Sequence, residues 1–178
     1  MFKTVAKSDY KQYPAFRLYP FRHKLDKRYP FYPNVGKMPW AAVTVVEMDK
    51  VKELIFVAAA TGRDPERYRQ PKTWHEERAS VGVVVGGIKE QTVALWERVK
   101  ESLEAAGAKF EDIIYRRRFV VRRGDWWDYM ETEHKWWQEH SPDLAENLRP
   151  GVGLKGGLEL DLPDMLIQVD TIAVTGKK

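Results

Sequence analysis

Hydrophobic and polar positions along the chain predict a mixture of strands and helices. Residues 40–47 and 53–60 are rich in β-branched and aromatic side chains. The charged turn 48–50 separates them, so we expect a β-hairpin. The polar stretch 61–79 contains two prolines and a glycine and predicts a long loop, and residues 81–85 predict a short strand.

Two segments have the spacing of amphipathic helices. Apolar residues recur at helical spacing over residues 88–103, and Gly107 provides a stop signal. A second helix is predicted over residues 126–140, with Asp125 as its N-cap. One stripe of this helix comprises Trp126, Met130, Glu133 and Trp137.

Three further segments are predicted to be strands. Residues 112–121 are strand-like, residues 151–160 form a glycine-rich strand, and residues 165–172 alternate polar with apolar positions as in a half-exposed strand. The stretch after Pro142 is predicted to be a loop. The order is β-β-β-α-β-α-β-β, an α+β arrangement with the helices on one face of a sheet.

Composition limits the possible functions. The chain has 178 residues, no cysteine and a net charge of +4. These values fit one domain and exclude a disulfide scaffold, thiolate catalysis and cysteine-based metal sites. No apolar run reaches the ~18–20 residues of a membrane span, and no secretory h-region is present. We therefore expect a cytoplasmic protein without a membrane partner.

Residues 1–38 differ from the rest of the chain. They hold nine basic residues, two acidic residues and nine of the 22 aromatic residues. Their four prolines break helices and favour extended chain. We interpret this segment as an arm that packs on the body, residues 39–178, or on a neighbouring subunit. Interleaved basic and aromatic residues also occur in nucleic-acid-binding arms, but no RNA-binding motif is present and we expect no nucleic-acid partner.

Two motifs suggest chemistry that their context does not support. The glycines at 151, 153 and 156 match a dinucleotide-binding pattern, but no helix follows them. Glycines in a strand more often mark a bulge or a close approach to a ligand or another backbone. The four histidines lack metal-site spacing, and no Gly-x-Ser-x-Gly elbow occurs.

Aromatic and basic clusters remain open to two interpretations. The tryptophan pairs at 126–127 and 136–137 indicate core or subunit interface, with stacking on an aromatic ligand as the alternative. Neighbours among the three arginines at 116–118 face opposite ways if they lie in a strand. A solvated edge is favoured there over an anion site. Arg149 is a candidate for a two-pronged contact with a carboxylate, beside a plain surface role.

From residue 39 onward the chain resembles the YjgF/RidA family of small enamine/imine deaminases. Residues 88–107, which end in Glu-Ala-Ala-Gly, look like the first helix of the family, and residues 110–121 look like the strand that follows. Residues 125–140 resemble the second helix and its exit. The runs Arg149-Pro-Gly-Val-Gly-Leu and Leu166-Ile-Gln-Val-Asp-Thr-Ile-Ala-Val resemble the end that is the family's signature.

The resemblance implies a six-stranded mixed β-sheet with two helices on one face, of the chorismate-mutase-like type. It also implies a homotrimer with active sites in clefts between subunits, and no metal or organic cofactor. Arg149 matches the arginine that holds the substrate carboxylate, and Trp40 matches an aromatic residue, usually tyrosine. Gln168 stands where the family has a water-orienting glutamate; an amide can position water but cannot accept its proton. The arm 1–38 and a loop insertion around 63–79 are additional to the family pattern.

Other positions complete the expected site. Asp170 occupies a second acidic position of the last strand, and Met130 lies near the position of an asparagine in the second helix. Gly151 replaces a cysteine or small residue and offers backbone groups to a ligand. Asp170 or Glu133 is the expected proton acceptor.

The predicted function is hydrolytic deamination of an enamine or imine carboxylic acid, which releases ammonia and a keto acid. The partner is then a small-molecule carboxylate substrate. Trp40 and the tryptophans of the second helix suggest a larger substrate, such as an aminomuconate-like acid from aromatic catabolism. Two alternatives remain open: tautomerisation or hydration of an unsaturated keto acid in the same cleft, and a non-catalytic trimeric ligand-binding protein.

Overall fold

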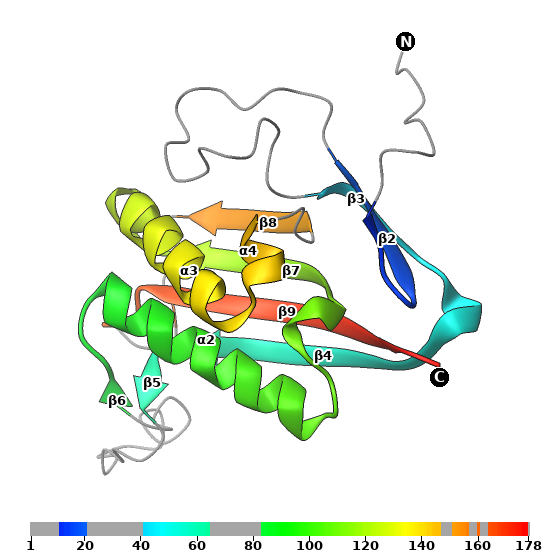
Figure 1. Ribbon diagram of the computed structural model, residues 1–178. Helices are drawn as coiled ribbons and strands as arrows, with labels where there is room; N and C mark the ends of the chain where they lie inside the picture. Colours follow the sequence, from blue (N-terminus) through cyan, green and yellow to red (C-terminus); the bar gives the residue numbers. More distant parts are fainter. Residues whose placement is uncertain are drawn as a thin grey trace.

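The structure, a computed structural model, describes residues 11–20, 41–64, 83–146, 151–156, 160 and 164–177. Within these ranges the main sheet is mixed and has the strand order β4-β9-β7-β8 (Figure 1). Its strands are β4 Val51–Thr61, β7 Ile113–Val120, β8 Gly151–Gly156 and β9 Ile167–Gly176. Strand β9 is antiparallel to β4 and β7, whereas β8 is parallel to β7. The described sheet thus has four strands, where the resemblance implied six.

Two helices cover one face of this sheet (Figure 1). They are α2 Ile88–Ala105 and α3 Trp126–His140, and both were predicted from apolar spacing. Gly107, just beyond α2, has a φ of +70°, a conformation that favours glycine at the end of a helix. Helix α3 lies in the crossover that the parallel β7–β8 pair requires. The α+β class and the packing of both helices on one face are confirmed.

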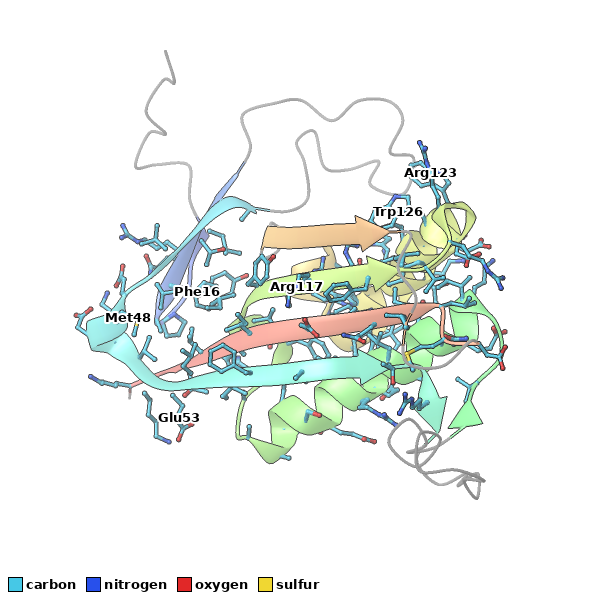
Figure 2. The ribbon with its side chains drawn as sticks, turned by 180° about the vertical axis from the view of Figure 1, so that it is seen from behind. Phe16, Met48, Glu53, Arg117, Arg123 and Trp126 are labelled. Atoms are coloured by element: carbon cyan, nitrogen blue, oxygen red, sulfur yellow. The ribbon has the colours of Figure 1, made fainter. Side chains whose placement is uncertain are left out.

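Alternation along the central strands gives the main sheet a covered face and an open face. In β9, Ile167, Val169 and Thr171 are buried, whereas Gln168 and Asp170 between them are only partly buried. Ile167 and Val169 pack with the helices in the main hydrophobic core. Gln168 and Asp170 lie on the open face, which is turned toward the viewer in Figure 2.

A smaller sheet includes part of the N-terminal arm. It has the order β1-β2-β3, with β1 Lys11–Gln12, β2 Phe16–Pro20 and β3 Ala41–Val46. Ala15, Phe16 and Leu18 form an apolar cluster with Ile114 and Val174 of the main sheet. The described part of the arm therefore packs on the body. The boundary predicted near residue 39 lies outside the described residues.

The predicted hairpin between β3 and β4 is wrong. In the described residues β3 pairs with β2, and β4 pairs with β9. The turn Met48–Lys50 forms a 3-10 helix, η2, instead of a tight reversal. Glu47 holds β3 to the arm: its carboxylate lies 3.0 Å from Nε of Arg17, and its N–H donates to the Ala15 carbonyl at 2.9 Å. Contacts with a distant segment, rather than the local turn, decide the strand partners.

Smaller elements account for the remaining differences. The predicted loop after Pro142 is a short helix, α4 Pro142–Glu146, because proline is favoured at a first helical position and Ser141 accepts the first backbone hydrogen bonds. Asp125 stands at the N-cap of α3, but its side chain makes no capping hydrogen bond. The other short elements are β5 Arg63–Asp64, β6 Val83–Val84, η3 Phe110–Asp112 and η4 Arg123–Asp125. No helix in the described ranges is both long and apolar enough to span a bilayer.

Candidate functional site

Polar and aromatic side chains gather at the centre of the open face. Gln168 and Asp170 come from β9, and Tyr115 and Arg117 come from the neighbouring strand β7. Arg117 is the register partner of Asp170, so their side chains are cross-strand neighbours. Figure 2 shows Arg117 near the middle of this face. The structure thus brings together the predicted residues Gln168 and Asp170 and adds an arginine beside them.

Asp170 connects the polar side chains of this face. Arg117 donates to Oδ2 of Asp170 from Nη2 at 2.9 Å and from Nε at 3.3 Å, and Gln168 donates from Nε2 to Oδ1 at 3.4 Å. The Arg117 side chain is 45% exposed and that of Asp170 is 25% exposed. An ion pair this accessible contributes only about 0–1 kcal/mol to stability. Its main effect is therefore to orient the two side chains.

A shallow hollow of about 380 Å³ lies beside this ion pair. Phe56, Tyr115 and Ile172 contribute apolar lining, and Arg117 and Asp170 contribute charged groups. Phe56 is 67% exposed, which is unusual for a phenylalanine in a strand. An exposed apolar patch with convergent polar groups is typical of a ligand site or a subunit contact.

Strand β8 carries no side chains beside Tyr115 and Arg117, the two residues of β7 that line the hollow. Gly151 is the register partner of Tyr115, and Gly153 is the register partner of Arg117. Because both positions are glycine, β8 offers only backbone there, and a ligand can approach it closely. The glycine pattern lies in a strand, as predicted, and it shapes the open face rather than a helix N-terminus.

Two candidate residues lie on the opposite, helix-covered face. Met130 and Glu133 belong to α3 and are buried on the side of the helix that faces the sheet, and Glu133 has 0% relative exposure. Nη1 of Arg118 lies 2.9 Å from Sδ of Met130. The structure therefore does not bring Met130 and Glu133 together with Gln168 and Asp170. Met130 and Glu133 lie on the same stripe of α3, and this stripe faces the core instead of the open face.

Glu133 is the centre of a buried charged cluster. Its carboxylate lies 3.2 Å from Nη1 of Arg116 and 3.2 Å from Nη1 of Arg118. Tyr129 donates its hydroxyl to Oε1 of Glu133 at 2.5 Å. Burial raises the pKa of Tyr129 well above its ordinary value, and the neighbouring Glu133 carboxylate raises it further. Tyr129 is therefore a neutral hydrogen-bond donor in the core.

Two tryptophans of α3 contact the arginines of this cluster. The Cζ atom of Arg116 lies 4.3 Å from the ring centroid of Trp137, and that of Arg118 lies 4.9 Å from the ring of Trp126. Such cation–π contacts are strengthened by desolvation. The solvated edge predicted for the arginine run is therefore wrong for Arg116 and Arg118, which are buried. Trp136 and Trp137 are core residues, and only Trp127 of this helix is an exposed tryptophan.

Arg149 and Trp40, two of the predicted site residues, lie outside the described residues. Their described neighbours, Gly151 and Ala41, belong to β8 and β3, and these two strands contact each other. In the described ranges no three His, Asp or Glu side chains gather closely enough to hold a metal ion.

Sequence reasoning missed Arg117, Tyr115 and Phe56. The alternation of the arginine run did indicate that Arg117 faces away from both of its neighbours. The missing information was which face the helices cover, and that depends on the tertiary arrangement. Phe56 lies in β4, and residue type alone does not tell whether an aromatic side chain in a strand is exposed or buried.

Solved structures with this fold include several YjgF/RidA proteins. YyfB of Yersinia pestis, a protein of unknown function in the conserved Rid family, has a TM-score of 0.60 and 17% identity, over 90% of this chain and 99% of its own. Escherichia coli TdcF with bound serine has a TM-score of 0.54 and 20% identity, over 77% and 92% of the two chains. The YjgF gene product of E. coli has a TM-score of 0.53 and 22% identity, over 76% and 91%.

These similarities assign the chain a fold. No family model matches the sequence, and no curated protein matches it. The molecule is thus an α+β protein with helices on one face of a mixed sheet. More specifically, it has the fold of the YjgF/RidA proteins, and the resemblance found in the sequence is confirmed at that level.

Proposed function

We propose that this protein hydrolyses an enamine or imine carboxylic acid to a keto acid and ammonia. The observation that carries the proposal is the pairing of Gln168 with Asp170 on the open face of a YjgF/RidA fold. TdcF, which shares the fold, was solved with bound serine. An amino-acid-sized carboxylate is therefore a reasonable ligand for this architecture.

The reaction requires a held carboxylate, a placed water and a proton acceptor. Arg149 would bind the substrate carboxylate through two parallel N–H bonds. The water oxygen adds to the imine carbon, and its proton passes to an acceptor. The acceptor returns this proton to the nitrogen, which gives a carbinolamine. The C–N bond then breaks, ammonia departs with the electron pair, and the hydroxyl proton passes to the departing nitrogen as the carbonyl forms. Because imines are intrinsically reactive toward water, placement contributes much of the required catalysis.

Gln168 would place the water and Asp170 would accept its proton. The two side chains are joined at 3.4 Å, so a water bound by the amide lies within reach of the carboxylate. Glu133, the other acceptor considered from the sequence, is fully buried on the opposite face of the sheet. Asp170 is therefore the acceptor in this proposal.

The proposed active form is a homotrimer. Leu54 and Phe56 of β4 and Tyr115 of β7 are exposed apolar side chains on the described surface. Neighbouring subunits would cover such a patch and close the cleft around the hollow. Light scattering coupled to size exclusion tests this part: a mass near three chains supports it, and a monomer at micromolar concentration contradicts it.

The activity is tested with imines formed in situ from amino acids by an amino-acid oxidase. The imine partitions between hydrolysis and trapping by semicarbazide, so catalysis lowers the yield of semicarbazone relative to a protein-free blank. Arg149→Ala should lower kcat/KM about 100-fold, because the charge-assisted contact with the substrate carboxylate is lost. Gln168→Glu should raise kcat about tenfold by supplying a second carboxylate next to the water.

Two results would favour other functions. An absorbance change in an unsaturated keto acid without ammonia release indicates tautomerisation or hydration. Binding of carboxylates without turnover of any imine indicates a ligand-binding protein. The amide at position 168 is the observation that favours this last alternative, and Gln168→Glu tests it directly.

A further inference from the structure

We infer that Arg117 binds a second carboxylate, so that the preferred substrate is a dicarboxylic imino or enamino acid. This inference rests on the proposed function, whose substrate carboxylate is assigned to Arg149. It concerns a different side chain, Arg117 on β7, to which the resemblance to the deaminase family assigns no role.

Arg117 is a cation on the open face, next to the proposed catalytic pair. It lies between Asp170 on β9 and Gly153 on β8 in the register of the sheet. Its side chain is 45% exposed and lines the hollow of about 380 Å³. That volume falls within the ~300–1,000 Å³ range of small-molecule sites. A charged group in this position meets any ligand that enters the hollow.

The guanidinium is held in place and still has donors to offer. Asp170 accepts bonds from Nε at 3.3 Å and Nη2 at 2.9 Å, and the Cζ atom lies 5.1 Å from the ring centroid of Phe119. A guanidinium has five N–H groups in a planar fork. Asp170 uses one edge of the fork, and among the described residues no second carboxylate pairs with the guanidinium, so the other edge can face a planar carboxylate. Fixing the cation beforehand lowers the entropy lost on binding.

The surroundings fit a flat, partly apolar chain between two charged ends. Glycine at 151 and 153 leaves β8 without side chains next to Tyr115 and Arg117. Phe56, Tyr115 and Ile172 contribute apolar lining to the same hollow. A short hydrocarbon chain can therefore lie against the apolar lining while its distal carboxylate contacts Arg117. An aminomuconate-like acid belongs to this class, although the buried tryptophans of α3 do not support it.

The test compares two imino acids of equal carbon number. 2-Iminoglutarate and 2-iminopentanoate, formed in situ from glutamate and norvaline, differ only in the distal carboxylate. We expect the protein to prefer 2-iminoglutarate at least tenfold in kcat/KM. Arg117→Ala should reduce this preference at least tenfold, mainly through KM, and Arg117→Lys should recover part of it because the charge returns without the fork.

Arg123→Ala is the matched control. Arg123 is exposed on η4 and lies away from Arg117 (Figure 2). Its substitution by alanine removes the same charge as Arg117→Ala does. It should leave the substrate preference unchanged. Thermal unfolding of each variant checks that the fold is intact.

A binding measurement separates this inference from the proposed function. Calorimetry with the products 2-oxoglutarate and 2-oxopentanoate needs no catalysis. Tighter binding of 2-oxoglutarate that Arg117→Ala abolishes supports the second carboxylate position, even if no imine is hydrolysed. Equal binding of both acids, or equal losses for both in Arg117→Ala, overturns the inference while leaving deamination intact.

Discussion

Three consecutive arginines on β7 occupy two environments that differ in almost every physical respect. Arg116 and Arg118 point into the helix-covered core, where they contact Glu133 and the rings of α3. Arg117 points the other way, is half-exposed and pairs with Asp170. Arginine thus stabilises the fold on one face of the strand, at positions 116 and 118, and remains accessible to a ligand on the other face, at position 117.

The degree of burial decides what each of these charges contributes. A buried guanidinium has lost its water, so it requires a nearby carboxylate and polarisable rings. A half-exposed ion pair contributes little to stability. Substitutions on the covered face should therefore alter the free energy of unfolding, and substitutions on the open face should alter the reaction.

The largest expected effect is on the covered face. Glu133→Gln removes the carboxylate that lies within 3.2 Å of both buried arginines. Loss of one partner from a buried charge cluster costs about 3–5 kcal/mol. Urea unfolding should show this decrease in the free energy of unfolding.

Glu131→Gln is the control on the same helix. Glu131 pairs with Lys135 at 2.8 Å, and the lysine side chain is largely exposed. Because this pair is exposed to solvent, its loss should change the free energy of unfolding far less than Glu133→Gln does. If Glu133→Gln costs no more than this control, the buried cluster is not what stabilises the core.

The next largest effect is on the open face and concerns rate rather than stability. Asp170→Asn removes the proposed proton acceptor, and kcat should fall about 100-fold for monocarboxylic and dicarboxylic imines alike. The free energy of unfolding should change by about 1 kcal/mol or less, since the pair with Arg117 is accessible. A fall confined to the dicarboxylic substrate would assign Asp170 to positioning Arg117 alone.

Elements with a clear local period could be predicted from the sequence. Helices α2 and α3 follow from apolar spacing over 18 and 15 residues, and alternation marked Gln168 and Asp170 as neighbours on one face. The partner of β3 could not be predicted in this way. It depends on Arg17 and Ala15, which lie in a segment distant in sequence from Glu47.

The candidate site was predictable in part for the same reason. Glu133 shares a stripe of α3 with Met130 and Trp137, and this mostly apolar stripe is the one that packs on the sheet. The burial of Glu133 could therefore be predicted from its position in the sequence. Arg117 could not be selected from its two neighbours, because alternation assigns opposite faces without saying which face the helices cover. Only the packed arrangement supplies that choice.

The smallest expected effect is the loss of one hydrogen bond on the covered face. Tyr129→Phe removes the hydroxyl that donates to Glu133 at 2.5 Å. A hydrogen bond to a charged group contributes about 1.5–3 kcal/mol, and since Arg116 and Arg118 still hold the carboxylate, the loss should lie at the low end. Urea unfolding at pH 7 measures it.

The same variant should change how stability depends on alkaline pH. Burial raises the pKa of Tyr129 above its ordinary value of 10.0, so the folded protein keeps a proton that the unfolded chain releases. The contribution is complete below pH 10 and decreases as pH rises above it, and Tyr129→Phe should therefore lose stability less steeply between pH 10 and 11. Burial also raises the pKa of Tyr13, with Asp143 and Glu111 adding to the effect, so a smaller slope of the same sign should persist. If Tyr129→Phe loses stability between pH 10 and 11 as steeply as the unsubstituted protein does, burial does not raise the pKa of Tyr129. This distinction between the two faces would then be removed.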